Sequence, residues 1–459
     1  MTHAAPPSLT PGDTGDGFWR DLFAHTSATV RLAGPVIVAR LGLLGLTAVD
    51  VLVLGRVSEH ELARYTLGTT PFDGLVAMLV GLLLGASVLV AKANGAGDQT
   101  EVGPIWHRGL LYGLVIGTGL AVLLQFSEPF FHAVGQSAEL AIGAAEVTRI
   151  LGLTMVPYAL FLTNQMVLEA LHRPTPGMVA MVVANLANLI LNPILAFGWF
   201  GLPALGAEGV AIGTVMIASG LALATTLYVL LHPQHRDLGV RARVSRPWRS
   251  AVAQRRIGYA SGASYGLEAS SFSILTLMVG LLGPLALAAH GVTFQFIALT
   301  FMIAFGIAAA TQVRVGTAWG RGAHRDVALA GWVGLVLAMV FVGVFSAIYA
   351  ITPLPLVRIF TDDPVIIAAA LPVMPWAALL LVFDGGQSVM NHACRGRGDT
   401  WFPTALHFGS YFLVMIPAGW VLAHTLGFGL VGIYQGIALA SVVSVVALAA
   451  RFAVLTRRR

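Results

Sequence analysis

Charge is scarce in this sequence. Only 10% of its 459 residues are Asp, Glu, Lys or Arg, whereas 57% are hydrophobic, and the mean hydropathy is +0.82. Soluble domains carry roughly 25% charged residues. A chain with so little charge cannot hide its apolar side chains in water-soluble cores. The composition therefore excludes a soluble protein and indicates an integral membrane protein.

Cysteine and several short motifs are missing as well. The single cysteine, Cys394, excludes an internal disulfide framework and a metal site built from several cysteines. There is no G-x-x-x-x-G-K-[ST] phosphate loop, so ATP is not the expected energy source. There is also no H-E-x-x-H motif or mid-span nucleophile–base pair, which argues against a membrane-embedded enzyme. We expect no cofactor beyond a coupling ion.

The formal charge of +5 does not indicate a nucleic-acid partner, because the basic residues stand in short loops between apolar segments. The expected partner of those segments is the lipid bilayer. Residues 1–17 lack the basic start and apolar core of a cleavable signal peptide, and we expect them to form a disordered cytoplasmic tail.

Long apolar windows fill the chain. A spanning helix needs about 20 predominantly apolar residues. On that criterion the sequence predicts an all-α fold with twelve transmembrane helices, at roughly 30–54, 66–92, 106–126, 147–169, 177–199, 207–232, 254–282, 285–312, 327–350, 364–392, 402–424 and 428–452.

Lys and Arg alternate from loop to loop and predict the orientation, because cytoplasmic loops are enriched in these residues. One side carries Arg20, Arg31, Lys92, Arg108, Arg173, the run from Arg236 to Arg256, Arg314, Arg321, Arg325, Arg395, Arg397, Arg451 and Arg457–Arg459. The other side holds only Arg56, Arg64, Arg149 and Arg358. We therefore expect a multi-pass protein of the inner (plasma) membrane with both termini in the cytoplasm.

Two glycine patterns recur at nearly one offset, which indicates a duplication. "GLLLGASVLVAKANGAGD" (81–98) resembles "GIAAATQVRVGTAWGRGA" (306–323), and "ALGAEGVAIGT" (204–214) resembles "GFGLVGIYQGI" (427–437). Convergent Gly-rich helix packing is the alternative explanation. Duplicated halves of six helices keep the same orientation, so a pseudo-two-fold axis runs along the membrane normal.

The duplication also predicts the domains. We expect a cytoplasmic tail at 1–27, an N-terminal six-helix lobe at 28–235, an Arg-rich cytoplasmic linker at 236–252 and a C-terminal six-helix lobe at 253–459. Repeats that meet around a central cavity are typical of secondary transporters.

Three acids lie within the predicted spans: Asp50, Glu268 and Asp384. A charge near the bilayer centre costs about 2.5–3.5 kcal/mol on insertion scales, so such residues are functional candidates. Asp50 lies towards the outer end of its span, and a solvated helix-end role stays open for it. Glu169, Glu208 and Asp73 lie nearer span ends, and for these three we favour an interfacial, solvated position.

The same acids carry a family resemblance over nearly the whole chain. The first span, "AGPVIVARLGLLGLTAVDVLVLGRV", resembles the opening helix of the multidrug and toxic compound extrusion (MATE) family. "LAAHGVTFQFIALTFMIAFGIAAATQVRVG" (287–316) and "FDGGQSVMNHACRGRGDT" (383–400) resemble its eighth helix and its tenth helix with the following loop. Glu268 and Asp384 resemble the NorM-like branch, whereas the DinF-like branch has an Asp in the fifth helix, where this chain has Asn192.

The resemblance implies an antiporter that exports small amphipathic organic cations in exchange for H⁺ or Na⁺, working as a monomer by alternating access. Asp50 would be the carboxylate of the first helix. Glu268 and Asp384 would be the coupling pair of the second half, and these two acids are the candidate Na⁺ ligands. The alternative is a flippase for lipid-linked oligosaccharides or lipids with a related two-lobed fold. A flippase of this kind would need several basic residues around the cavity to bind the pyrophosphate of its lipid substrate. Only one basic residue, Arg40, is clearly within a predicted span.

Further candidates for the cavity wall are polar or aromatic. They are Arg40, Asn192, Tyr265, His290 and Gln387. Arg40 replaces a residue that is neutral in the family, and it lies about 15 Å along a helix from Asp50, too far to pair with it. We therefore expect Arg40 either to pair with a carboxylate on another helix or to line a polar cavity. Tyr265 could stack on a cation or pack against lipid. For His290 we favour a helix-end position held by a backbone carbonyl over proton relay.

Overall fold

The computed structural model describes residues 15–241 and 247–457. Most of the predicted tail at 1–17, and residues 242–246 of the predicted linker, lie outside these ranges. Within them the chain is almost entirely helical, and every predicted span coincides with a helix or a bent pair of helices.

The N-terminal lobe contains the first six spans. They are α1 (Gly15–Leu54), α2 (Glu59–Ala96), α3 (Val102–Gln125), the pair α5 (Ala138–Gly152) and α6 (Met155–Ala170), α7 (Thr175–Phe197) and α8 (Gly206–Leu231). Short α4 (Glu128–Ala133) connects α3 to α5. Helices α5 and α6 meet at an angle of 43° and together make one span.

The C-terminal lobe repeats this order. It contains α10 (Val252–Gly280), α11 (Pro284–Gly320), α12 (His324–Ile351), the pair α14 (Pro364–Ala370) and α15 (Met374–Gly396), a span from α16 (Trp401–Phe408) through α17 (Ile416–Trp420) to Thr425, and α18 (Gly429–Arg457). Short α9 (Pro247–Ser250) and α13 (Pro353–Val357) lie between spans. The α14–α15 pair is bent by 47°, like its counterpart in the first lobe.

Nine described helices are long and apolar enough to cross a membrane, and the two bent pairs bring the number to eleven. Helix α10 is the twelfth. Its 29 residues reach about 44 Å, but its serines and Glu268 make it less apolar than the nine helices. The polarity is compatible with a membrane because Ser261, Ser264 and Ser271 are buried against other helices.

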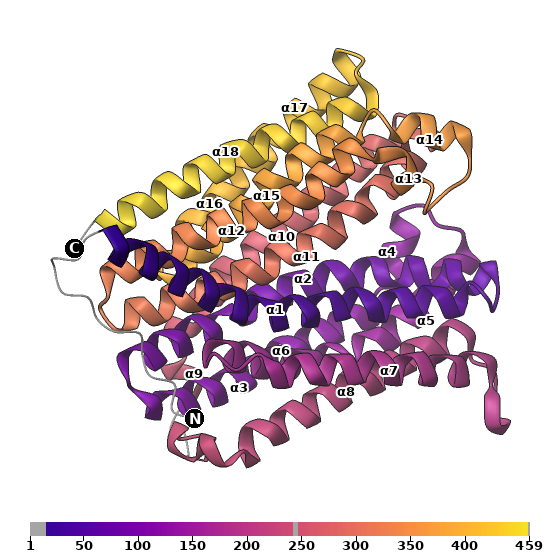
Figure 1. Ribbon diagram of the computed structural model, residues 1–459. Helices are drawn as coiled ribbons and strands as arrows, with labels where there is room; N and C mark the ends of the chain where they lie inside the picture. The colour runs from indigo at the N-terminus through magenta and orange to yellow at the C-terminus, as the bar shows by residue number, and fades with distance from the viewer. Residues whose placement is uncertain (1–14, 242–246, 458–459) are drawn as a thin grey trace.

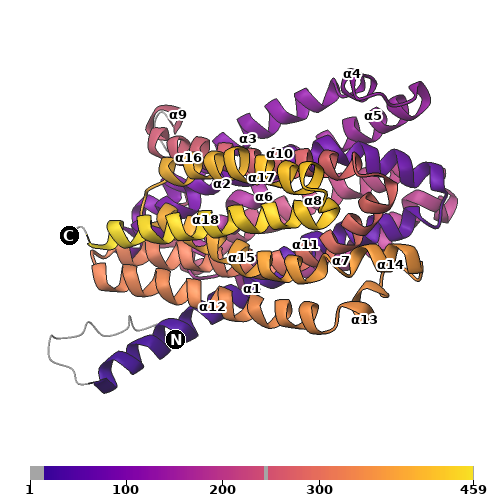
Figure 2. The same ribbon diagram turned by 90° about the horizontal axis from the view of Figure 1, so that it is seen from above.

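The two lobes lie side by side and diverge from one end. Figure 1 shows the indigo-to-magenta lobe and the orange-to-yellow lobe in contact near the end where α1 starts and α18 ends, here called the terminal end, and splayed apart at the opposite end. The view from above shows the start of α1 projecting beyond the other helices at the terminal end (Figure 2). Helix α1 contacts α11 and α12 of the second lobe as well as α7 of its own, so it bridges the lobes.

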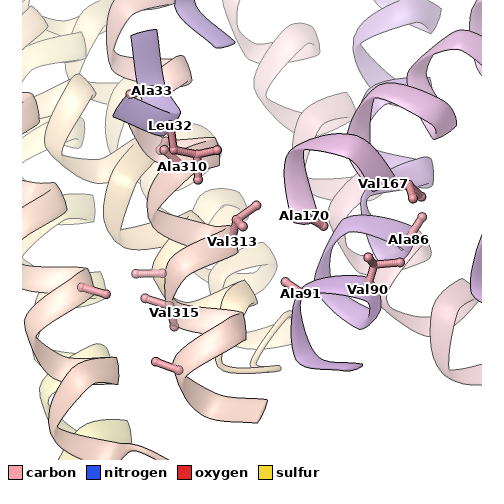
Figure 3. Close-up of a cluster of buried hydrophobic side chains, with 14 of the residues drawn as sticks. Leu32, Ala33, Ala86, Val90, Ala91, Val167, Ala170, Ala310, Val313 and Val315 are labelled. Atoms are coloured by element: carbon pink, nitrogen blue, oxygen red, sulfur yellow. The ribbon is translucent and has the colours of Figure 1, made fainter. Parts of the chain in front are cut away.

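Small residues make the contact between the lobes at the terminal end. Ala86, Val90 and Ala91 of α2 belong to the same buried cluster as Ala310 and Val313 of α11. Figure 3 shows these side chains, with Leu32 and Ala33 of α1 beside Ala310. Because alanine and valine project little from a helix, the backbones approach closely, as is typical of helix pairs in membranes.

Polar contacts between side chains also cross between the lobes at the terminal end. The Gln312 side-chain amide donates to Ser87 Oγ at 3.2 Å. His172 lies 3.2 Å from Thr317 Oγ1 and has a φ of 60°, a left-handed backbone conformation that is uncommon for a residue other than glycine.

Candidate functional site

Asp50 is held by three side chains in the N-terminal lobe. The Tyr65 hydroxyl of α2 donates to Asp50 Oδ2 at 2.7 Å. The amides of Asn188 and Asn192 on α7 donate to Oδ1 at 2.9 and 2.6 Å. The two asparagines are four residues apart, so both face α1 from one side of α7. With these bonds and 4% exposure, Asp50 is buried in the bundle and is not a solvated helix end.

A cavity of about 220 Å³ opens beside this network. Four N-lobe spans in addition to α7 contribute to its wall: α1, α2, the α5–α6 pair and α8. The wall consists of Leu43, Leu44, Leu46, Thr47, Asp50, Tyr65, Thr69, Phe72, Asp73, Val76, Leu151, Thr154, Tyr158, Asn188, Thr214, Ile217, Ala218 and Leu221. It combines apolar and aromatic side chains with two carboxylates, and none of these residues is Lys, Arg or His.

Arg40 pairs with a carboxylate on another helix. Its Nη2 lies 3.8 Å from Glu169 Oε1 of α6, and the two side chains are 6% and 4% exposed. Gln165 donates to the same Glu169 oxygen at 2.9 Å. The Arg40 guanidinium also lies 5.1 Å from the centre of the Phe305 ring on α11 of the other lobe. The predicted solvated position of Glu169 is therefore wrong, because its span end lies inside the junction of the two lobes.

Glu208 and Asp73, the other two acids for which we predicted a solvated position, both remain accessible to solvent. Glu208 pairs with Arg64 at 3.1 Å and its side chain is 38% exposed, consistent with the predicted solvated position. Asp73 is exposed and lines the 220 Å³ cavity. It therefore faces a cavity of the protein, which its sequence position alone did not predict.

Glu268 and Tyr265 line a second, much smaller cavity in the C-terminal lobe. Its volume is about 20 Å³, the size of a single water molecule. Its wall consists of Tyr265, Glu268, Phe301, Phe305, Gln387, Ser388, Asn391, His392, Arg395 and His407. This lining shares no residue with the larger cavity. The structure thus places Asp50 and Glu268 in separate cavities, one in each lobe.

Asp384 lies behind the small cavity and is linked to Glu268 through side chains. The Gln387 amide donates to Asp384 Oδ1 at 2.7 Å and to the Tyr411 hydroxyl at 2.6 Å. The Tyr411 side chain also interacts with Glu268. The two acids of the predicted coupling pair therefore belong to one network, in which Gln387 and Tyr411 are the bridging groups.

Arg395 differs most from its predicted position. The sequence pattern groups it with the cytoplasmic loops, but its side chain is 1% exposed and lines the small cavity. The guanidinium lies 5.2 Å from the centre of the Tyr265 ring. No carboxylate of the described residues lies within ion-pairing distance of it, and its Nε and Nη2 have no hydrogen-bond partner there. Arg40 is thus not the only cation buried in the bundle.

His290, the candidate histidine, and the buried His392 have different partners. His290 is buried and its Nδ1 lies 3.0 Å from the Tyr434 hydroxyl, so the expected backbone carbonyl is replaced by a side chain. It lines neither cavity. His392, by contrast, has a backbone partner like the one that we expected for His290, because its Nδ1 lies 2.8 Å from the Ser388 carbonyl. Its Nε2 lies 3.2 Å from the Tyr265 hydroxyl.

The fold and these cavities define a class of protein. Within the described residues, twelve spans form two like-oriented lobes, each with a cavity and buried acids, which is the architecture of a two-lobed membrane transporter. The MatE family model matches residues 35–194 and again residues 261–421. These matches cover well over half of the chain, one in each half, and the chain belongs to the MatE family. The double match confirms the duplication that the glycine patterns predict.

Curated relatives match along almost the full length. The probable multidrug resistance protein NorM of Caulobacter vibrioides is 36% identical over 434 residues, which are 94% of this chain and 91% of that protein. The protein of the same name from Deinococcus radiodurans is 33% identical, over 95% of this chain and 96% of its own. The chain is therefore a transporter and not an enzyme.

Solved structures confirm the fold. The crystal structure of the eukaryotic MATE transporter AtDTX14 has a TM-score of 0.86 over 95% of this chain and 98% of that chain, at 20% identity. A multidrug resistance MATE family transporter of the MOP superfamily in an outward-facing conformation has a TM-score of 0.86 at 19% identity, over 94% of this chain and 97% of that chain. At such low identity these structures establish the fold alone.

Proposed function

We propose that this protein is a secondary multidrug efflux antiporter of the inner membrane. It exports small amphipathic organic cations in exchange for H⁺ or Na⁺. The observation that carries the proposal is the 220 Å³ cavity, whose wall has two carboxylates, Asp50 and Asp73, among apolar and aromatic side chains and no cationic residue. Such a wall attracts a positive charge on an apolar body and repels an anion. The names of the NorM relatives support multidrug export.

The flippase alternative is less favoured. A lipid pyrophosphate needs cations at its binding site, and the larger cavity offers none. Arg40 is paired with Glu169, which leaves Arg395 as the buried cation without a carboxylate partner. It lines a cavity of about 20 Å³, far too small for a lipid-linked sugar.

We place the coupling chemistry on Asp50, Glu268 and Asp384, with Glu268 and Asp384 as the candidate ligands of Na⁺ if Na⁺ is the coupling ion. Exchange is obligatory in this scheme because the organic cation and the coupling ion compete for negative charge. Lobes at 28–235 and 253–459 move about the linker at 236–252, and the protein works as a monomer. Alternating access is supported by the arrangement of the lobes, which meet at the terminal end and diverge at the other (Figure 1).

Efflux of a cationic dye from proteoliposomes, with the Na⁺ and proton gradients imposed independently, tests the proposal. The wild-type protein should export the dye when one gradient is present and not when both are absent. Asp50→Asn, Glu268→Gln and Asp384→Asn should each reach the membrane at wild-type levels and export the dye at less than one tenth of the wild-type rate. Wild-type rates in all three variants would rule out the carboxylate mechanism.

The proposed orientation places both termini and the linker in the cytoplasm, on the basis of the Lys and Arg distribution. In a Cys394→Ser background, a membrane-impermeant thiol reagent added to intact cells should label Ser137→Cys. Ser137 is exposed in the loop before α5, at the end remote from the termini. The same reagent should not label Ser245→Cys in the linker. If the reagent labels position 245 from outside, the proposed orientation is wrong and the linker faces the outside of the cell.

A further inference from the structure

Asp73 differs from Asp50 in one respect that bears on substrate binding. Both carboxylates line the larger cavity. Asp50 accepts three hydrogen bonds from Tyr65, Asn188 and Asn192. A carboxylate has about four lone-pair sites, so most of the capacity of Asp50 is already used. A substrate cation that came to Asp50 would displace an amide or a hydroxyl and leave it without its partner in a buried site.

Asp73 has no such partners. It makes no hydrogen bond and no ion pair with any residue in the described ranges, and it is exposed. A carboxylate that faces a cavity without a partner can receive a cation without breaking an existing contact. Among the wall residues, Asp73 is therefore the acid that is available to a ligand.

The position of Asp73 suits an amphipathic ligand. Tyr65, Thr69, Phe72, Asp73 and Val76 all line the cavity, and their spacing places them on one face of α2. Asp73 lies eight residues after Tyr65, which is about 12 Å farther along the helix. It therefore lies farther from the start of α2, and nearer the middle of that helix, than the Asp50–Tyr65 contact.

The other wall residues could surround the rest of a ligand. Tyr158 of α6 lines the same cavity, so aromatic rings from two helices are available to a cation and its apolar body. Leu43, Leu46 and Leu221 add apolar surface.

We propose that Asp73 is the substrate carboxylate of the N-terminal lobe, and that its ligand is an organic cation with a single permanent charge on an aromatic or apolar body. Asp50, held by its three donors, keeps the role of an engaged coupling acid. This assignment rests on the proposed export of organic cations and specifies which acid contacts them.

Binding of tetraphenylphosphonium to the purified full-length protein tests the assignment, with uncharged triphenylphosphine oxide as the comparison ligand. Asp73→Asn should weaken binding of the cation about tenfold and leave binding of the neutral compound within twofold of the wild type. Asp73→Glu, which keeps the charge, should restore cation binding to within threefold. The matched control is Glu59→Gln, which removes a carboxylate from an exposed position in the first turn of the same helix, outside the cavity.

The possible results distinguish a failure of the Asp73 assignment from a failure of the proposed export of organic cations. A wild-type protein that neither binds the cation nor exports dye contradicts the proposed function itself. If the wild type binds the cation, the Asp73 assignment fails in either of two cases: Asp73→Asn changes cation affinity by less than threefold, or it weakens the neutral ligand equally. If Asp50→Asn loses more affinity for the cation than Asp73→Asn does, Asp50 and not Asp73 is the substrate carboxylate.

Discussion

Glu169→Gln is expected to lower the free energy of unfolding by about 3–5 kcal/mol, because it leaves Arg40 as a buried cation without a counter-charge. The side chains of Arg40 and Glu169 are 6% and 4% exposed, so water cannot replace the lost carboxylate. The pair joins α1 to α6 at the junction with the second lobe, and its loss should also loosen the contact of Arg40 with Phe305. Thermal and denaturant unfolding of the detergent-solubilised variant measures the effect.

Arg40→Gln combined with Glu169→Gln provides the matched test. Replacement of both members of a buried pair is often nearly neutral, so the double variant should recover most of the stability lost by Glu169→Gln alone. Glu208→Gln is the control at an exposed pair, because Glu208 is 38% exposed and its contact with Arg64 should contribute no more than about 1 kcal/mol. Equal stability of Glu169→Gln and the wild type would mean that Arg40 has found another partner or water.

The sequence predicts the helices well because each span is a long apolar window, and a window of that kind has few alternatives in a bilayer. It also places α10 correctly, although Glu268 and the serines of that helix lower its hydropathy. The bends between α5 and α6 and between α14 and α15 are not predicted. They depend on how each pair packs in its lobe, which hydropathy does not record.

Burial near span ends is harder to predict. Glu169 and Arg395 both lie in the last turns of their helices, where a charged residue would ordinarily reach water. Here the two lobes meet at this end, so the last turns stay inside the protein. One signal was available in the sequence: a basic residue within a span, Arg40, requires a nearby carboxylate.

The partners of Asp50 illustrate a second limit. Asn192 was a candidate through its position in the fifth span, but Asn188 and Tyr65 were not. The repeat of asparagine at 185, 188 and 192 indicates a polar face on that helix. It does not tell which helix the face meets. Asn185 donates to the Gly42 carbonyl of α1 and not to Asp50. Contacts between helices far apart in sequence required the structure.

Gly85 of α2 faces the backbone of α10 across the contact between the lobes. A methyl group added at Gly85 would collide with the Gln254 carbonyl, and a backbone atom cannot move aside as a flexible side chain can. Gly85→Val is therefore expected to keep the lobes from closing at the terminal end and to abolish transport, while the helices within each lobe remain folded. The loss should be complete because a cycle of alternating access must pass through the closed arrangement.

Cross-linking measures the closure directly. Ser87 and Gln312 touch across the same lobe contact, at 3.2 Å. With Cys394 replaced by serine, cysteines at 87 and 312 should cross-link efficiently with a short bifunctional thiol reagent, and Gly85→Val should remove that cross-link. Gly119→Val is the control, because Gly119 of α3 is exposed and an added Cβ meets no atom within 4 Å. If Gly85→Val retains both the cross-link and dye efflux while Gly119→Val behaves as the wild type, tight closure between α2 and α10 is not required for transport.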